Sequence, residues 1–533
     1  MKFTIYYLLF TICFSAVGQL QLNGRPQGFA PTFDCEIGNE LNGRPQGFAP
    51  TFDCEIGNEV NGRPQGSLLQ KEGQRLNESI DSLIRVTSFL RTSELGMAVY
   101  DLDEGRMLYR HNSQKLFRPA STQKIITAVT ALSLLGKDYE YRTSLSLYGE
   151  ISGDTLHGDI CVTGGLDPLL TDEDMNTFVE AIYNKGIRYV DGGLIGDVSL
   201  MDSIYWGSGW SWDDAPGYYQ PYVSPLMLNG GYVDIAVIPS SKGARPKVRV
   251  TPVSDYYTVD NKALSMTPSL GNIEVSRNWM YGGNEIVVTG NSSSQYNCKL
   301  SIFPSEQFFL STLLYELRLR GIIFRSEKLK VKSEKLIAGD YEETGDREGR
   351  PYIESEEFQV STELTDVMEK ALKKSDNLCA ETMFILMGMT LENVKSTSFE
   401  AGEEAVKKFM KEVVGRSPED CNIVDGSGLS PYNLISPDLM MEYLKLGSRH
   451  ELFLLSLPVS GTDGTLRNRM KRGKAFGNVR AKTGSVTGVS TLAGFAEQKS
   501  TGHRLAFVIF NQNILKSREA RNFQDKVCEL LCR

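Results

Sequence analysis

The chain has 533 residues, of which 41% are hydrophobic and 23% charged, and its formal net charge is -9. Two or three domains are expected, because single cores stop growing at about 250–300 residues. Because the net charge is negative and no long run of basic residues is present, neither nucleic acid nor an anionic membrane surface is expected as a partner. The four histidines form no metal-binding motif and accompany no GxSxG elbow. No metal or organic cofactor is therefore expected, and a Ser-His-Asp triad is disfavoured.

The N-terminus, residues 1–18, has the organisation of a secretory signal peptide. Lys2 gives a short positive region, residues 6–17 are uncharged and mostly apolar, and residues 16–18 offer a cleavage site. Because the apolar stretch is short for a membrane span, a cleaved signal is favoured over an uncleaved anchor. The mature protein is expected to be exported to the periplasm without integral membrane association, in a compartment that permits disulfides.

A tandem repeat follows the predicted signal. Residues 22–40 and 41–59 are identical copies of LNGRPQGFAPTFDCEIGNE, and a partial third copy begins at residue 60. The segment is rich in Gly, Pro, Asn and Gln without hydrophobic periodicity, which favours a disordered linker over residues 19–67. A duplication in the DNA or an error in the gene prediction explains the identity of the copies equally well. The six cysteines beyond the linker match no metal motif, and no pairing among them is predicted.

Beyond the linker, the sequence predicts a helix, a hairpin and a second helix in turn. Residues 68–90 have the apolar spacing of a helix. Two short strands, 97–100 and 107–109, flank a turn at residues 103–105, which is typical of a β-hairpin. A strong helical pattern then covers residues 122–135.

The middle of the chain has shorter elements, broken by Gly, Asp and Pro. Helical spacing at 172–186 and 306–320 brackets a region that has strand patterns almost throughout. We therefore expect a small β-rich third domain at residues 231–298. It is nested within a second domain made of residues 144–230 and 299–349.

Helical patterns return near the C-terminus, at residues 364–389, 401–414 and 516–531. Three strand-like runs precede the last helix: NVRAKTGS, STLAGFAEQ and RLAFVIFNQ. Together with the first hairpin, these runs predict one antiparallel sheet covered by helices. The expected fold is an α/β domain, residues 68–143 and 350–533, that is split by the long insert.

Ser121 and Lys124 form an SxxK element at the start of the second predicted helix. Residues three apart on a helix lie on one face, about 5–6 Å apart at Cβ, so the amine can reach the hydroxyl. Pro119 and Ala120 place Ser121 at the helix start, where backbone N–H groups favour developing negative charge. Alone, an SxxK is common and more typical of an N-cap serine beside an exposed lysine.

Ser375, Asp376 and Asn377 form an SDN element. The Ser375 hydroxyl is a candidate for passing a proton to a leaving amine, and the Asn377 amide is a candidate for holding a substrate carbonyl. Alone, these three residue types are equally typical of a junction between a helix and a loop.

Residues 482–485 form a KTG element followed by serine, within a strand-like run. Lys482 and Thr483 are candidates for binding a terminal carboxylate, and Gly484 lets backbone and substrate approach closely. The N–H groups of Ser121 and Ser485 are candidates for an oxyanion hole. Alone, the element is typical of a turn at a strand end.

The three motifs together, in this order, are those of class A β-lactamases and penicillin-binding proteins. Further segments are similar to those of one family of penicillin-binding proteins, among them GDICVTGGLDPLL, KKSDNLCAETMF, DGSGLSPYN and RAKTGSVTGVSTLAGF. From residue 68 to its end, the chain resembles the D-alanyl-D-alanine carboxypeptidase/endopeptidase family of low-molecular-mass penicillin-binding proteins. The resemblance implies a split domain of the serine β-lactamase and transpeptidase type. The family's large insert accounts for the long interval between Ser121 and Ser375.

The resemblance also implies a function and a set of site residues. It implies a serine-type D-Ala-D-Ala carboxypeptidase, with DD-endopeptidase activity, that cleaves peptidoglycan stem peptides through an acyl-enzyme and is inhibited covalently by β-lactams. Ser121 is then the nucleophile, Lys124 its base and Ser375 a proton relay coupled to Lys124. Burial beside Lys482 is expected to lower the pKa of Lys124. The loop at residues 425–428 is expected to shape the site without taking part in the chemistry.

Two other functions are compatible with parts of the pattern. A β-lactamase shares the acylation step but hydrolyses the drug adduct rapidly, and class A enzymes need a further glutamate loop that the sequence does not identify. A non-catalytic cell-wall-binding protein retains the fold without the nucleophile, and the three intact motifs argue against it. Labelling with penicillin distinguishes the three functions.

Overall fold

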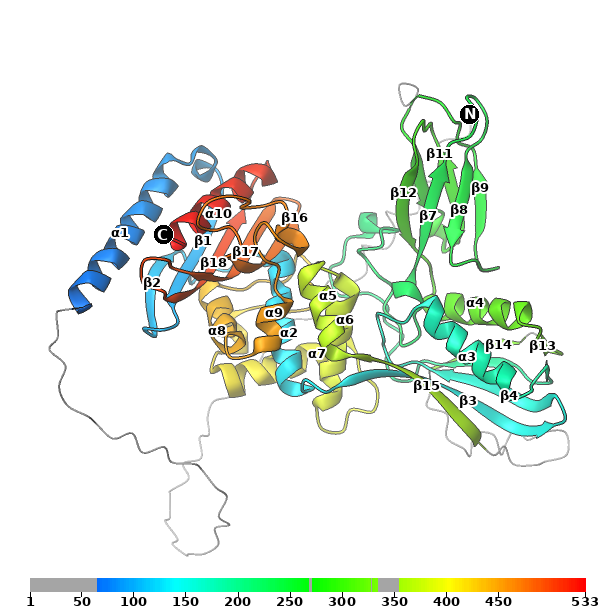
Figure 1. Ribbon diagram of the computed structural model, residues 1–533. Coiled ribbons are helices and arrows are strands. Elements are labelled where there is room, and N and C mark those ends of the chain that lie inside the picture. The colour runs from blue at the N-terminus through cyan, green and yellow to red at the C-terminus, as the bar shows by residue number, and fades with distance from the viewer. Residues whose placement is uncertain (1–64, 268–270, 327, 334–353) are drawn as a thin grey trace, which may run out of the picture. The chain divides into compact units, whose positions relative to one another are not determined.

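The structure, a computed structural model, describes residues 65–267, 271–326, 328–333 and 354–533 (Figure 1). The predicted signal peptide and the predicted linker up to residue 64 lie outside the described residues, whereas residues 65–67, the predicted end of the linker, are helical. All of the described elements belong to one unit, Pro64–Arg533. Among the described residues, no helix is long and apolar enough to cross a membrane.

A five-stranded antiparallel sheet with the order β16-β17-β18-β1-β2 forms the centre of the catalytic half. It confirms the predicted sheet, since the first hairpin joins the three last strands. The strands are β1 (Glu94–Asp101), β2 (Arg106–His111), β16 (Arg480–Val486), β17 (Val489–Glu497) and β18 (Arg504–Gln512).

Helices cover both faces of this sheet, as Figure 1 shows. Alternate residues of β18 enter two different hydrophobic cores: Phe507 and Ile509 one, Val508 and Phe510 the other. A central strand buried on both faces has a continuous apolar run, and this explains the sequence of β18. The first core includes residues of α1 (Gln65–Val86) and α10 (Ser517–Leu531).

The second core is built mainly from helices. These are α2 (Gln123–Leu134), α5 (Leu364–Lys373), α6 (Asn377–Met387), α7 (Phe399–Phe409), α8 (Pro437–Gly447) and α9 (Glu451–Ser456). Helix α8 illustrates how the sequence sets an element boundary, because the Ser436 hydroxyl accepts a hydrogen bond from the Leu439 N–H and Pro437 opens the first turn.

A second, seven-stranded sheet lies between the two halves of the catalytic part in sequence. Its strands are β3 (Glu140–Ser152), β4 (Thr155–Thr163), β5 (Tyr189–Val190), β6 (Leu194–Asp197), β13 (Ile323–Phe324), β14 (Leu329–Lys332) and β15 (Glu354–Glu363). Helices α3 (Asp172–Asn184) and α4 (Ser305–Leu319) share a separate hydrophobic core with it. Strand β15 pairs with β3 along its length, so this sheet extends past residue 349, the predicted end of the insert.

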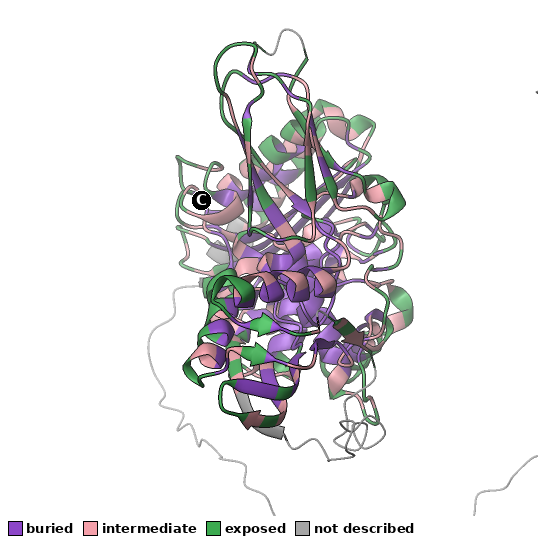
Figure 2. Cartoon of the chain, turned by 90° about the vertical axis from the view of Figure 1, so that its right-hand side faces the viewer, coloured by how far each residue is buried: buried purple, intermediate pink, exposed green. Residues whose placement is uncertain are grey.

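Two three-stranded sheets, of order β12-β7-β8 and β10-β11-β9, follow between α3 and α4. Their strands are β7 (Tyr232–Ile238), β8 (Lys247–Thr251), β9 (Thr258–Asn261), β10 (Glu274–Arg277), β11 (Glu285–Thr289) and β12 (Tyr296–Ser301). Figure 2 shows exposed and intermediate residues along much of these strands. A buried guanidinium links them to the preceding loop, because Arg277 donates to the Tyr222 hydroxyl at 2.9 Å.

The six cysteines in the described part of the chain are all free thiols. Four of them are buried: Cys161, Cys379, Cys528 and Cys532. They fill space in the cores as small apolar side chains.

Candidate active site

Ser121 lies in a single 3-10 turn, Ala120–Thr122, that leads directly into α2. Two hydroxyls fix this turn, since Thr122 and Thr491 both donate to the Pro119 carbonyl, at 2.6 and 2.8 Å. Lys124 stands one turn further and is wholly buried. Its amine donates to the Ser121 Oγ at 3.0 Å, so the SxxK pair meets as the spacing predicts.

The SDN motif occupies the break between α5 and α6. The predicted helix over residues 364–389 is interrupted there, because Ser375 has a φ of 61° and Asp376 caps α6 by accepting from the Cys379 N–H at 3.0 Å. A left-handed serine costs about 1–3 kcal/mol and turns the chain sharply. The turn aims Asn377 at the nucleophile, where its Oδ1 accepts from the Lys124 amine at 2.7 Å.

The KTG motif lies on β16, the edge strand of the catalytic sheet. Lys482 is buried and donates to the Ser375 Oγ at 2.8 Å. The Thr483 hydroxyl donates to Thr465 Oγ1 at 2.8 Å, and Ser485 is exposed. The structure therefore brings together the side chains of the three motifs, which lie far apart in the sequence.

Gly484 fits where β16 passes the nucleophile turn. A Cβ atom at this position would lie 2.1 Å from Thr491 Oγ1 and 2.9 Å from both the Pro119 carbonyl oxygen and the Ser121 nitrogen. Only glycine lets the strand approach this closely. The contact places the backbone of β16 beside the Ser121 nitrogen.

Two buried carboxylates lie near Lys124: Glu381, which the sequence did not single out, and Asp425, the first residue of the loop that was expected to shape the site. Glu381 on α6 accepts hydrogen bonds from the N–H groups of Gly426 and Ser427, at 2.8 and 2.9 Å. The carbonyl of Ser427 in turn accepts from the Lys124 amine at 2.8 Å. Asp425, in the same loop, accepts from the N–H of Gly428 and from three other donors. The only signal in the sequence was the acidic residue four positions after Asn377, on one face of α6.

Burial and charge set the protonation of the two lysines. Burial lowers the pKa of Lys124 to about 8, and the charges of Glu381 and Asp425 oppose that shift. The pKa of Lys482 falls well below its usual value, through burial and the nearby charge of Lys124. The lowered pKa that the sequence predicted for Lys124 thus comes from burial, while the repulsion between the lysines acts on Lys482.

Ser375 was predicted to be coupled to Lys124 as a proton relay, but its hydroxyl contacts the other lysine of the site. Ser375 Oγ is hydrogen-bonded to Lys482, whereas Lys124 is bonded to Ser121, Asn377 and the Ser427 carbonyl. The side-chain nitrogen of Asn377, Nδ2, donates to the Tyr219 carbonyl at 2.7 Å. The amide therefore ties the lysine to the loop before β7.

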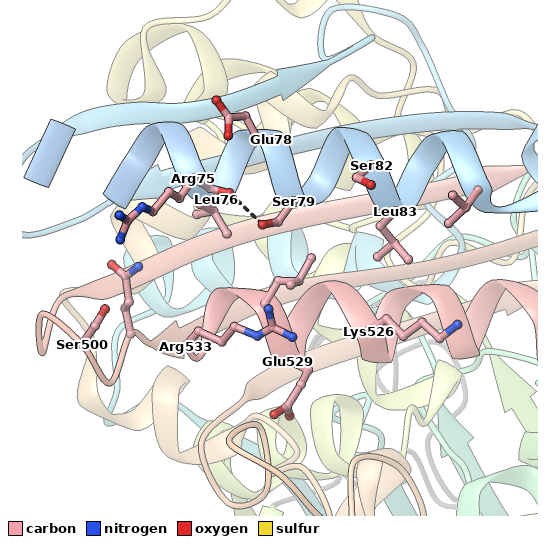
Figure 3. Close-up of a pocket in the computed structure, with 13 residues that line it drawn as sticks. Arg75, Leu76, Glu78, Ser79, Ser82, Leu83, Ser500, Lys526, Glu529 and Arg533 are labelled. Atoms are coloured by element: carbon pink, nitrogen blue, oxygen red, sulfur yellow. Dashed lines mark hydrogen bonds between the residues drawn. The ribbon is translucent and has the colours of Figure 1, made fainter. Parts of the chain in front are cut away.

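Other features of the described residues lie outside this cluster. Asp101, Glu104 and His503 have ligand atoms within 4.8 Å of one another, a spacing that suits a metal ion. Asp101 caps the hairpin turn, accepting from the Asp103 and Glu104 N–H groups at 3.0 and 2.9 Å. A cavity of about 910 Å³ lies between α1 and α10, and no residue of the three motifs lines it (Figure 3).

With this geometry in place, the comparisons with known proteins decide the family. Residues 76–533 match the family described as D-Ala-D-Ala carboxypeptidase 3 (S13). The chain belongs to this family. The predicted family is thereby confirmed, and with it the prediction that the chain is a serine peptidase of the D-Ala-D-Ala carboxypeptidase class.

Similar proteins come from several organisms. The D-alanyl-D-alanine carboxypeptidase DacB of Haemophilus influenzae is 27% identical over 437 residues, which cover 78% of this chain and 85% of that protein. The D-alanyl-D-alanine carboxypeptidase of Actinomadura sp. is 28% identical over 462 residues, covering 82% of this chain and 80% of that protein.

A solved structure shares the fold. The crystal structure of penicillin binding protein 4 from Haemophilus influenzae superposes with a TM-score of 0.72 at 23% identity. The match covers 85% of this chain and 99% of that chain. It confirms the predicted fold class, a split domain of the penicillin-binding type with an insert.

Proposed function

We propose that Ser121 is the acylated nucleophile of this peptidase and that its substrate is the D-Ala-D-Ala end of peptidoglycan stem peptides. One observation carries the proposal: the Lys124 amine, wholly buried, lies 3.0 Å from the Ser121 hydroxyl. A serine hydroxyl is a weak nucleophile until a neighbouring base takes its proton. An amine with a pKa of about 8 is neutral often enough near neutral pH to serve as that base.

Acylation follows from this arrangement. Neutral Lys124 removes the Ser121 proton, and Oγ attacks the carbonyl carbon of the penultimate D-alanine. The negative charge that develops on the carbonyl oxygen is stabilised by the N–H groups of Ser121 and Ser485. Lys482 and Thr483 bind the terminal carboxylate of the substrate, and the Asn377 amide helps to orient its peptide backbone.

The leaving amine needs a proton, and Ser375 is placed to deliver one. Its Oγ accepts a hydrogen bond from Lys482 at 2.8 Å, which leaves its own hydrogen free for another acceptor. That acceptor is the nitrogen of the departing D-alanine, and Lys482 replaces the proton that Ser375 gives up. When water hydrolyses the acyl-enzyme, a proton of the water returns through Ser375 to Lys482, and Lys124 gives its proton back to the Ser121 Oγ. The same steps cleave a cross-link whose scissile bond joins D-amino acids, so DD-endopeptidase activity is part of the proposal. β-Lactams enter the same cycle as covalent inhibitors.

The proposal extends to the location and the domains. An enzyme with this substrate works in the periplasm, which agrees with the signal-like residues 1–18. We assign residues 231–298 to a nested third domain. Two three-stranded sheets support this assignment, because their strands come after β6 and before α4 in the sequence, and both of these elements belong to the second domain. Strand β15 moves the end of that second domain to about residue 363.

Penicillin labelling tests the nucleophile. The purified protein is incubated with a fluorescent penicillin and separated under denaturing conditions, with Ser121→Ala as the matched variant. We expect a long-lived adduct on the wild type and none on Ser121→Ala. Equal labelling of both would refute the assignment of Ser121, and rapid steady hydrolysis of the drug would instead indicate a β-lactamase.

Mass spectrometry of digested muropeptides tests the substrate. We expect release of the terminal D-alanine from uncross-linked pentapeptides and separation of cross-linked dimers. A labelled enzyme that leaves both substrates intact would indicate a penicillin-binding protein with a different substrate.

A further inference from the structure

A second cavity, of about 520 Å³, lies where β16 begins, beside α9. Its lining residues come from outside the three motifs. The apolar part of its wall consists of Leu102, Leu454, Leu455, Phe476 and Phe495. Leu455 and Phe476 are each 53% exposed, although both are large apolar side chains. The cavity has the size of a small-molecule site, since such sites typically hold about 300–1,000 Å³.

Most of the polar side chains around this cavity already have partners. Lys499 pairs with Glu497 at 3.1 Å, and Arg504 pairs with Asp103 at 2.8 Å. The Asn478 amide is occupied as well, because it donates to the Glu497 carbonyl at 2.8 Å and accepts from the Glu497 N–H at 3.1 Å. These groups satisfy one another, so the charge that is available to a ligand comes from the remaining side chains.

Two opposite charges in the lining have no such partner. Among the residues that the structure describes, Arg480 and Glu451 form neither an ion pair nor a side-chain hydrogen bond. The charge of Arg480 acts on Asp463 at longer range, but that carboxylate is already bound to other groups, the Lys373 amine and the Val459 N–H. A guanidinium offers five N–H donors, and those of the partly buried Arg480 reach no acceptor in the described chain. The cavity therefore presents one free cation and one free anion beside an apolar wall.

We propose that this cavity binds a short zwitterionic peptide with apolar side chains, at a site separate from the catalytic cleft. Arg480 holds the terminal carboxylate of the peptide, and Glu451 holds its terminal ammonium group. Leu455 and Phe476 cover its apolar side chains and are shielded from water in turn. A ligand with a single charge, or with none, leaves one of the two protein charges unpaired as it displaces water, which costs affinity.

The test is a calorimetric titration with three forms of one dipeptide: L-leucyl-L-phenylalanine, its N-acetylated form and its C-terminal amide. Each blocked form lacks one of the two terminal charges. We expect each to bind about tenfold more weakly than the free dipeptide. Arg480→Gln should remove the penalty of the amide and keep that of the acetyl group, whereas Glu451→Gln should do the reverse.

The matched control is Arg518→Gln, which removes an exposed arginine of α10 and should keep both penalties. Glu451 is exposed, so Glu451→Gln tests the site even where Arg480→Gln lowers stability. Equal binding of the three forms, or penalties that neither variant changes, overturns the inference. Saturation with penicillin beforehand should leave the titration unchanged. A dipeptide that competes with penicillin occupies the catalytic cleft, and that result overturns the inference as well.

Discussion

Lys124 is the residue on which the chemistry depends most directly. Its amine is buried, makes hydrogen bonds to three oxygens and has a pKa lowered to about 8. Only the neutral amine can accept the Ser121 proton. The second-order rate of penicillin acylation should therefore rise with pH, reach half of its plateau near pH 8 and level off above it, as stopped-flow labelling across a pH series would measure.

The control for this profile is Lys124→Arg. Its guanidinium keeps its proton throughout the accessible pH range, so it cannot act as the base. We expect no labelling of this variant at any pH. A variant that labels with the wild-type profile would show that another group activates Ser121.

Glu381 acts on Lys124 from beneath. Burial and the charge of Asp425 raise the pKa of Glu381 to about 8, so its carboxylate ionises in the same pH range as Lys124. In its ionised form it raises the pKa of the lysine, and its two oxygens hold the loop whose Ser427 carbonyl binds the amine. Glu381→Gln removes the charge, so the pKa of Lys124 should fall and the rise of the acylation rate should move to lower pH. Stability should drop by about 1–3 kcal/mol, because an amide oxygen replaces only one of two acceptors.

The matched control is Glu403→Gln on α7, which removes a partly exposed carboxylate paired with Lys407. Its pH profile should match that of the wild type. If Glu381→Gln loses stability without any change in the pH profile, Glu381 is structural and does not tune the base.

Gly484 is where the catalytic sheet passes close to the nucleophile turn. Gly484→Ala should lower the acylation rate about 100-fold or more, because the new methyl group displaces the Ser121 N–H from its oxyanion geometry. Gly73→Ala in α1 provides the control, since its nearest neighbour atoms lie 3.8 Å away. That change should leave labelling intact and stabilise the helix by up to about 1 kcal/mol. Wild-type labelling of Gly484→Ala would contradict the proposed oxyanion hole.

At the scale of elements, the break between α5 and α6 positions two site residues at once. Asp376 stabilises it by capping α6. Asp376→Ala should lower the free energy of unfolding by about 1 kcal/mol and slow acylation, since α6 begins with Asn377. Asp376→Asn keeps a capping oxygen and should restore most of both quantities in thermal unfolding and labelling assays. Equal losses in the two variants would show that the 3.7 Å ion pair with Lys370, and not the cap, is what matters.

The sequence predicted the elements better than their contacts. The hairpin, the helix after Ser121 and the three last strands follow from periodicity and turn chemistry, and all are confirmed. The left-handed Ser375 was not predictable, because apolar spacing continues across the break on both sides. The role of Glu381 was hidden for a related reason: its partners are backbone N–H groups, which leave no mark in the sequence.

At the scale of the whole molecule, the hydrophobic cores of the catalytic part are separate from the core of the insert. The catalytic cores surround the five-stranded sheet, and a third core belongs to the inserted elements. Scanning calorimetry should show two transitions, of which penicillin raises only one, because the drug binds covalently to the part that holds Ser121. The Ser121→Ala protein should show no such shift. A single transition that moves as a whole would mean that the insert and the catalytic part unfold together.

The pairing of β1 with β18 has a consequence for the order of events during synthesis. Val99 lies opposite Phe507, so the centre of the sheet joins a strand near the start of the fold to one near the end of the chain. Such a high contact order delays folding until both partners exist. A growing chain presents Ser121 early, but it stays catalytically silent and unfolded in its catalytic half until the last strands emerge.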